Sequence, residues 1–316
     1  MSRTIETHRA RNPRLFLFHG IVAVLIAVLA GGMAYQQLLK TVKYSERERL
    51  QNQRRVVTPG PRGRILDRDG NVLVDNRARF SVVLNLAELR GEFRSEFKVV
   101  KANYAKFPVA ERPDGDQLAR IARASVAQRY LDKINFILNR HETVRTDDLN
   151  RHVNQSLLLP YTLLDDVAPE EYARLIERLP VKSPLQVYAT SNRYYPYHNA
   201  AAHALGYTST ENDPEVEDFP GEDLLTFKMK GSTGKAGLEK YFDDELQGET
   251  GGAIYLVDPA GYKVDLPIEK RLPVQGKNLV TSLDIELQQA AEAAMEGRTG
   301  AAVALDVRTG EVLAMV

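Results

Sequence analysis

The sequence predicts an α+β protein with one N-terminal transmembrane helix, an elongated β-rich module with inserted helices, and then a further helix with a β-hairpin. Three observations predict this order. A twenty-residue apolar stretch lies near the N-terminus, short apolar runs flank Asp- and Gly-containing turns in three places, and helical periodicity lies between them. With 316 residues, 43% hydrophobic and 27% charged, the chain can bury a core and is not globally disordered.

The composition excludes several classes of function. Lys plus Arg and Asp plus Glu both total 42, so the formal net charge is zero. The first 68 residues hold 13 basic and 4 acidic side chains and the rest hold 29 and 38, so we do not expect a globally basic nucleic-acid-binding protein. The absence of Cys excludes disulfides, zinc-thiolate sites, iron–sulfur clusters and thiol catalysis, and it suits an oxidising compartment.

Residues 15–34 read LFLFHGIVAVLIAVLAGGMA, in which only His19 is clearly polar. At about 1.5 Å per residue this stretch spans roughly 30 Å, the hydrocarbon thickness of a bilayer. Four arginines precede it, which predicts a cytoplasmic N-terminus and an exported remainder. Small residues at 30–32 leave a cleavable signal peptide open as the alternative. We favour a retained anchor, because the apolar stretch is long and helix-compatible sequence continues to residue 55.

The exported part begins with a predicted stalk helix over residues 35–55, which Pro59 and Pro61 are expected to break. Residues 62–74 (RGRILDRDGNVLV) predict a β-hairpin in which Gly70 supplies the positive φ of the turn. Further strands or hairpins are predicted at residues 80–86, 185–188, 256–264 and 305–312. We expect the hairpin at 62–74 and a second one at 253–264 to share one sheet.

Helical periodicity dominates residues 115–180, where residues 168–179 are expected to form a short helix of their own. Residues 281–284 (TSLD) match a capping box ahead of apolar residues at helical spacing, and Gly297 is expected to end that helix. Residues 211–223 carry seven acids and no base. We expect a solvated loop there, with an acidic docking surface as the alternative.

The sequence contains no complete catalytic or metal-binding motif. Residues 231–235 (GSTGK) place two residues between the glycines where a Walker loop needs four, and the six histidines are scattered. The Ser-x-x-Lys spacing of some serine acyl-transferases occurs at Ser95 and at Ser232, but neither is followed by the Ser-x-Asn and Lys-Thr/Ser-Gly motifs that such a site needs. We therefore predict no catalytic residue, no cofactor and no metal site in this chain.

Four short motifs follow one another along the chain. They are R-G-R-I with D-R-D-G (Arg62, Gly63, Asp67, Arg68, Gly70), R-Y-Y-P with H and G-Y (Arg193, Tyr195, Pro196, His203, Gly206, Tyr207), G-K-A-G-L-E with Y and L-x-G (Gly234, Gly237, Leu238, Glu239, Tyr241, Gly248), and residues 281–284 with the hairpin at 300–316. In this order they resemble the N-terminal half of class B penicillin-binding proteins, the monofunctional peptidoglycan transpeptidases. The joined second motif resembles the elongation-type members. One departure is His198-Asn199, where the family usually has a glycine after Pro-Tyr.

The resemblance implies four parts: a cytoplasmic tail at 1–14, a transmembrane anchor at 15–39, a periplasmic pedestal (the penicillin-binding protein dimerisation domain) at 40–280, and the truncated start of a β-lactamase-like transpeptidase domain at 281–316. The catalytic Ser-x-x-Lys of the family lies downstream of this hairpin, so the chain is expected to be inactive alone. The motif residues would then be structural. Gly63, Gly70, Gly206 and Gly237 would permit tight turns or close backbone approach, and ion pairs are expected among Arg62, Arg68 and Glu239.

The resemblance also implies partners and a location. The partners would be the membrane, a SEDS-type glycosyltransferase and rod-shape scaffold proteins, with peptidoglycan stem peptides only for the complete protein and no nucleic acid. The chain would lie in the cytoplasmic membrane with its N-terminus in the cytoplasm and its bulk in the periplasm. Two functions stay open: the pedestal portion of a D,D-transpeptidase that cross-links the cell wall during elongation, or a stand-alone, non-catalytic, membrane-tethered interaction module.

Overall fold

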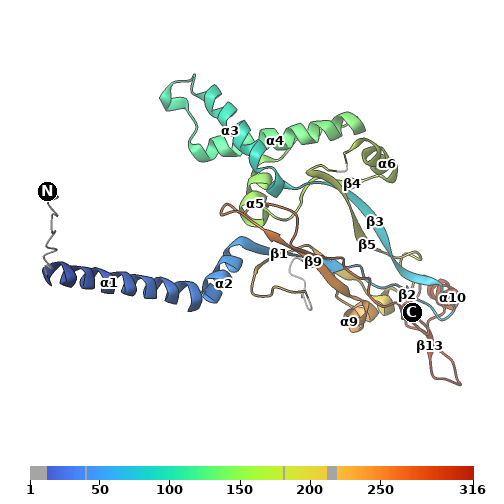
Figure 1. The fold of residues 1–316 in the computed structure, drawn as a ribbon. Helices are drawn as coiled ribbons and strands as arrows, with labels where there is room; N and C mark the ends of the chain where they lie inside the picture. The colour runs from blue at the N-terminus through green and yellow to red at the C-terminus, as the bar shows by residue number, and fades with distance from the viewer. Residues whose placement is uncertain (1–12, 40, 181, 212–218) are drawn as a thin grey trace, which may run out of the picture. The chain divides into compact units, whose positions relative to one another are not determined.

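A computed structural model describes residues 13–39, 41–180, 182–211 and 219–316, and it confirms the predicted α+β class (Figure 1). The chain divides into two compact units, Met1–Gln51 and Asn52–Val316. The first unit contains α1 (Pro13–Ala34), a π-helical turn η1 (Tyr35–Leu39), and α2 (Thr41–Asn52), whose last residue belongs to the second unit. Residues Phe16–Gln37 form a helix long and apolar enough to cross a membrane, at the place where the sequence predicts the anchor.

The second unit begins with a four-stranded sheet in the order β10-β9-β1-β7. Its strands are β1 (Gln53–Gly60), β7 (Leu225–Lys228), β9 (Gly248–Leu256) and β10 (Glu269–Arg271). The predicted stalk helix therefore ends at Asn52, before the prolines, so the prediction that Pro59 and Pro61 break this helix is wrong. Strand β1 continues through Pro59 because its pairing with β9 shifts register between Thr58 and Gly60, where a missing backbone N–H is tolerated.

A second sheet has the order β11-β2-β3-β4, and β5 also pairs with β3. Strands β2 (Ile65–Leu66) and β3 (Val72–Leu84) confirm the predicted hairpin, with Gly70 at φ 89°. The strand predicted at 80–86 is the second half of β3. Strands β4 (Tyr161–Val167) and β5 (Leu185–Tyr194) pair with β3, and β5 confirms and extends the strand predicted at 185–188.

The two predicted hairpins do not share a sheet, which corrects that expectation. Strand β9 pairs with β1 and β10, whereas β2 and β3 pair with β11, β4 and β5. The turn after β9 does form as predicted, since Val257 and Lys263 make an isolated bridge around Gly261 at φ 86°.

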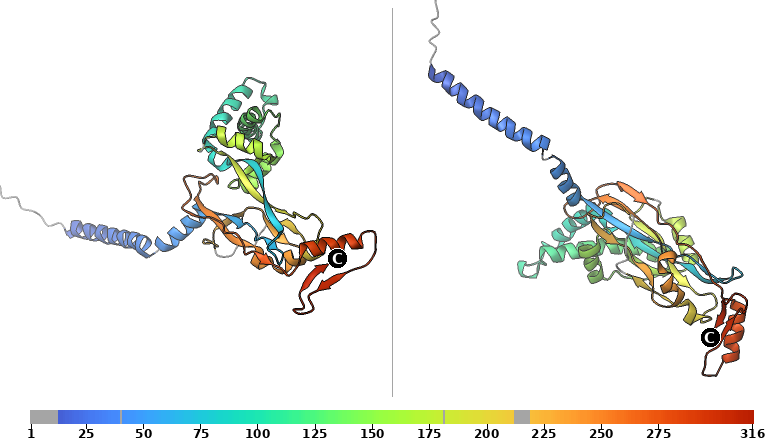
Figure 2. Two further views of the ribbon diagram at one scale, coloured as in Figure 1. Left: turned by 90° about the vertical axis from the view of Figure 1, so that its right-hand side faces the viewer. Right: turned by 90° about the horizontal axis from the view of Figure 1, so that it is seen from below.

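Helices gather at one end of the second unit (Figures 1 and 2). They are η2 (Leu86–Glu88), α3 (Arg90–Tyr104), η3 (Val109–Glu111), α4 (Gly115–Leu138), α5 (Thr146–Ser156) and α6 (Pro169–Arg178). Helices α4, α5 and α6 confirm the helical prediction for 115–180, although β4 interrupts it. The sequence analysis missed α3, although Phe93, Phe97, Val100 and Tyr104 recur at helical spacing and pack into buried clusters. The largest buried cluster lies between these helices and strands β3, β4 and β5.

The remaining elements are short: α7 (Ala202–Leu205), β6 (Thr208–Glu211), β8 (Gly231–Gly234), α8 (Gly237–Tyr241), α9 (Asp243–Leu246) and β11 (Leu279–Val280). The C-terminal part confirms the predicted helix and hairpin as α10 (Ile285–Met295), β12 (Val303–Leu305) and β13 (Val312–Met315). The helix cap differs from the prediction. Asp284, not Thr281, caps α10, because its carboxylate accepts from the backbone N–H groups of Glu286 and Leu287. Most of the acidic segment, 212–218, lies outside the described residues.

Candidate functional site: a buried arginine–glutamate network

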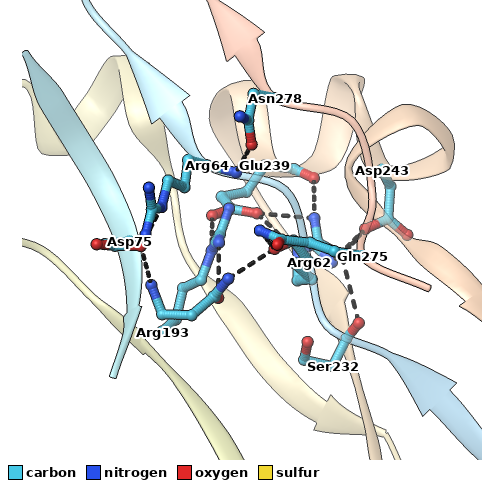
Figure 3. A network of polar contacts seen from close by, with 11 residues as sticks. Arg62, Arg64, Asp75, Arg193, Ser232, Glu239, Asp243, Gln275 and Asn278 are labelled. Atoms are coloured by element: carbon cyan, nitrogen blue, oxygen red, sulfur yellow. Dashed lines mark hydrogen bonds and ion pairs between the residues drawn. The ribbon is translucent and has the colours of Figure 1, made fainter. Parts of the chain in front are cut away.

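Two buried arginines bind one buried glutamate inside the second unit (Figure 3). The Glu239 side chain on α8 is fully buried, and the side chains of Arg62 and Arg193 are only 4% and 6% exposed. Arg62 donates to Glu239 Oε2 from Nη2 at 2.7 Å and from Nε at 3.1 Å. Arg193 donates from Nε to Glu239 Oε1 at 2.6 Å. One residue from each of the first three sequence motifs therefore meets at a single carboxylate.

The Arg62 guanidinium contacts several acceptors of the network at once. Its Nη1 donates to Asp243 Oδ1 at 2.6 Å and to the Ser232 carbonyl at 3.3 Å, and its Nη2 also donates to the Glu239 carbonyl at 3.1 Å. These partners lie 170–181 residues further along the chain. A planar guanidinium with five donors suits such a junction, because it can bind several acceptors at fixed angles.

Asn76 closes the network on the β3 side. Its Nδ2 donates to the Arg62 carbonyl at 2.6 Å, and its Oδ1 accepts from Arg193 Nη1 at 2.9 Å. Two arginine charges therefore face the two carboxylates of Glu239 and Asp243. Burial of charge is tolerated when the charges are paired and hydrogen-bonded, so this balance matters for stability.

Two polar groups beside the network are buried without a hydrogen bond in the described part of the chain, Arg193 Nη2 and Tyr195 Oη. Burial raises the pKa of Tyr195, and the nearby negative charge of Glu239 raises it further. Tyr195 is thus held as the neutral phenol at any physiological pH.

Close backbone approach places Glu239. Gly206 has φ 77°, and a Cβ there would lie 1.8 Å from the Ala236 carbonyl oxygen. On the other side, Gly237 has φ 58° and a Cβ there would lie 2.5 Å from the Ala204 carbonyl oxygen. The two glycines thus let the end of α7 touch the start of α8, two residues before Glu239.

The D-R-D-G turn joins the hairpin to the C-terminal part. Asp67 is fully buried and accepts from the backbone N–H groups of Asp69 and Asn71 and from Asn71 Nδ2. Burial acts to raise the pKa of this carboxyl, but hydrogen bonds from Asn71, Asp69 and Ile285 outweigh it and the pKa is lowered. The backbone of Arg68 donates to Leu283 at 2.9 Å, so the turn contacts the segment that leads into α10.

The ion pair expected between Arg62 and Glu239 is confirmed, but Arg68 does not join it. The Arg68 side chain is exposed and makes no ion pair within the described residues, since it is Asp67 of this motif that points inward. Tyr207 and Tyr241 are also exposed, at 59% and 81%. Their sequence signal is therefore not explained by core packing.

The remaining motif positions lie around the network rather than in it. Gly63 and Gly248 make close backbone contacts, since a Cβ at either would lie within 2.3 Å of a carbonyl oxygen. Leu238 packs against the cluster beneath the hairpin, and His203 is exposed on α7. His198 has φ 55°, in the left-handed region that favours glycine.

Neither candidate serine stands at a helix start. Ser95 lies exposed inside α3, and Ser232 lies on strand β8. Among the described residues, no group of three His, Asp or Glu side chains could hold a metal ion. Sequence reasoning missed Asn76 and Asp243; only Asp243 carried a signal, its place four residues after Glu239.

Residues 57–281 match the family described as the penicillin-binding protein dimerisation domain. The peptidoglycan D,D-transpeptidase MrdA of Acinetobacter baumannii is 28% identical over 314 residues, which cover 98% of this chain and 40% of that protein. MrdA of Escherichia coli is 28% identical over 309 residues, covering 96% of this chain and 43% of that protein. The chain thus spans about two fifths of the length of these curated relatives.

A solved structure gives a weaker match. It is the complex between penicillin-binding protein 2 and MreC from Helicobacter pylori, with a TM-score of 0.46 and 21% sequence identity. The match covers 84% of this chain and 42% of the matched one.

Proposed function

The chain belongs to the penicillin-binding proteins that carry the dimerisation domain, and on that premise we propose that it is the membrane-anchored pedestal portion of an elongation-type peptidoglycan D,D-transpeptidase. The observation that carries the proposal is the network around Glu239. It lies inside the matched region and draws on all three motifs that the pedestal contributes. The similarity to MrdA over nearly the whole chain favours the elongation type.

The proposal divides the chain into the four parts that the family resemblance implies. Residues 1–14 form a cytoplasmic tail, 15–39 the anchor, 40–280 the periplasmic pedestal, and 281–316 the start of the transpeptidase domain. The pedestal performs no chemistry. Its network holds β3, β5, α8 and the segment before β2 that contains Arg62 in fixed positions relative to one another. Its D-R-D-G turn contacts the segment that leads into α10.

Thr281 supports this docking role. Its backbone N–H and its Oγ1 both bond the Leu66 carbonyl at 2.9 Å, and β11 pairs in parallel with β2 just before it. The segment that leads into α10 is therefore attached to the hairpin by the pairing of β11 with β2 as well as by the Thr281 side chain. A pedestal built this way would hold a following catalytic domain in a fixed position on the second unit.

We further propose that the pedestal is the surface for a SEDS-type glycosyltransferase and for rod-shape scaffold proteins, as its family resemblance implies. The stem peptides of peptidoglycan would be substrates of the complete protein only. No residue of this chain is assigned a catalytic role.

A topology experiment tests the anchor. A periplasm-active reporter fused after Gln51 should be active, and the protein should stay with membranes after a carbonate wash, because the helix at Phe16–Gln37 is long and apolar enough to cross a bilayer. Recovery of a soluble protein that starts near residue 33 would establish a cleaved signal instead.

A co-isolation experiment tests the pedestal. The chain, solubilised in mild detergent from rod-shaped cells, should bring down a SEDS-type glycosyltransferase. The matched control is residues 1–51 fused to an unrelated periplasmic domain, which keeps the anchor and loses the pedestal. Equal recovery with both proteins would contradict a role for the pedestal.

A further inference from the structure

The side chain of Gln288 on α10 makes the hydrogen bonds that a neighbouring strand would otherwise make with the free edge of β13. Its side chain is buried, with only 1% of its surface exposed. Its Nε2 donates to the Met315 carbonyl at 2.9 Å, and the Met315 N–H donates to its Oε1 at 2.8 Å. Both backbone groups of Met315 are thus satisfied by one side-chain amide, which links the position of β13 to that of α10.

Glu292, one turn further along α10, continues the chain of bonds into the pedestal. Its Oε1 accepts from Gln288 Nε2 at 2.7 Å and from the Ala201 N–H at 2.8 Å. Ala201 belongs to the turn at 195–201, which follows the R-Y-Y-P motif. One carboxylate oxygen therefore connects the pedestal turn with the C-terminal hairpin.

The pedestal turn depends on such a partner. Ala201 and His198 have φ 56° and 55°, in the left-handed region that L-residues with a Cβ rarely adopt. Ala201 is buried and precedes the four-residue helix α7, whose start receives no side-chain cap. The Glu292 carboxylate supplies an acceptor at this strained position, and it comes from an element more than ninety residues away.

We propose that Glu292 is a positioning residue: the relay Ala201–Glu292–Gln288–Met315 holds the pedestal turn and the C-terminal hairpin in one arrangement, so that loosening either end loosens both. This proposal rests on the proposed function in one respect, because it treats the C-terminal hairpin as the start of a domain that the pedestal carries. The relay itself is a property of this chain and needs neither a partner nor an activity.

Amide hydrogen exchange on the full 316-residue chain in detergent tests the relay. Glu292→Leu removes the shared acceptor, so exchange should become about tenfold faster or more at both residues 197–206 and 311–316. Glu292→Gln keeps an Oε1 acceptor and should restore slow exchange at both places. Glu296→Leu is the matched control, an exposed glutamate one turn on, and should match the parent.

Three results would overturn the relay. They are unchanged exchange in Glu292→Leu, faster exchange at only one of the two segments, and a Glu292→Gln variant as loose as Glu292→Leu. Gln288→Leu breaks the relay from its other end and should also release both segments, which keeps the proposal testable if Glu292→Leu does not fold. Because the readout is amide exchange, failure of the relay is distinguishable from failure of the pedestal role, which membrane and co-isolation experiments measure.

Discussion

Replacing Glu239 by Gln should strongly destabilise the second unit. The substitution keeps the size of the side chain but removes the one charge that both buried arginines share, at 2.7 Å from Arg62 and 2.6 Å from Arg193. It also turns an acceptor into an NH₂ group that must face an arginine donor. Removing one partner of a buried ion pair typically costs about 3–5 kcal/mol, because the remaining charge stays buried without compensation. For a unit of this size that corresponds to a melting temperature roughly 6–20 °C lower.

Urea unfolding of the full chain in detergent, followed by the fluorescence of its 14 Tyr in the absence of Trp, measures this loss. Asp165→Asn is the control, because it removes an ion pair with Arg79 whose side chains are 39% and 58% exposed. That change should alter the free energy of unfolding by less than about 1 kcal/mol. If Glu239→Gln lost no more stability than Asp165→Asn, the network would not be what holds the motifs together.

Three further predictions concern the turns and the serines. Gly206→Ala should lower the free energy of unfolding by at least about 3 kcal/mol, because a Cβ there would clash with the Ala236 carbonyl and the φ is unfavourable for alanine. Gly70→Val should lower it by only about 1–2 kcal/mol, because the φ of 89° is unfavourable but the space around the residue is open. Equal losses of stability in thermal unfolding would contradict this difference. Asp67 has a lowered pKa in the folded state, so its stabilising effect is complete above its usual pKa of 3.8 and is lost as the pH falls through the folded value. The stability difference between parent and Asp67→Asn should therefore be constant near neutral pH and shrink below about pH 4, and a difference that grew on acidification would be evidence against it. The chain should form no covalent adduct with a fluorescent penicillin on a denaturing gel, because Ser95 and Ser232 lack the surrounding groups of an acyl-transfer site; a stoichiometric adduct lost on Ser232→Ala or Ser95→Ala would refute that view.

Local signals were sufficient for the hairpins and for most helices. Turns that run from an Asp to a Gly between apolar runs located β2–β3 and β12–β13, and apolar spacing located α4, α6 and α10. Long-range pairing decided the failures. Pro59 lies inside strand β1, which its pairing with β9 makes possible. The failure at α3 was different, because the apolar spacing of Phe93, Phe97 and Val100 was present in the sequence and was overlooked among charged neighbours. The turn residues of a hairpin do not specify which other strands pair with it. The sequence therefore could not show that the hairpins at 62–74 and 253–264 belong to different sheets.

The network shows the same limit at the level of side chains. The motifs marked Arg62, Arg193 and Glu239 as special, but nothing in their spacing showed that both arginines would bind one carboxylate. Those contacts join residues 46 and 177 positions apart, and their geometry is created by the fold. Asn76 carried no signal at all, since a single Asn after a hairpin is ordinary in a sequence.

The central claim, that this chain is the pedestal portion of an elongation-type transpeptidase, is tested most directly by exchange of parts. The matching N-terminal two fifths of Acinetobacter baumannii MrdA would be replaced by this chain in cells depleted of their own MrdA. The chimera should restore rod shape and growth, and the same chimera with Glu239→Gln should not. A chimera that reaches the membrane and binds penicillin at the parental level, yet leaves the cells round, would show that this chain is not such a pedestal.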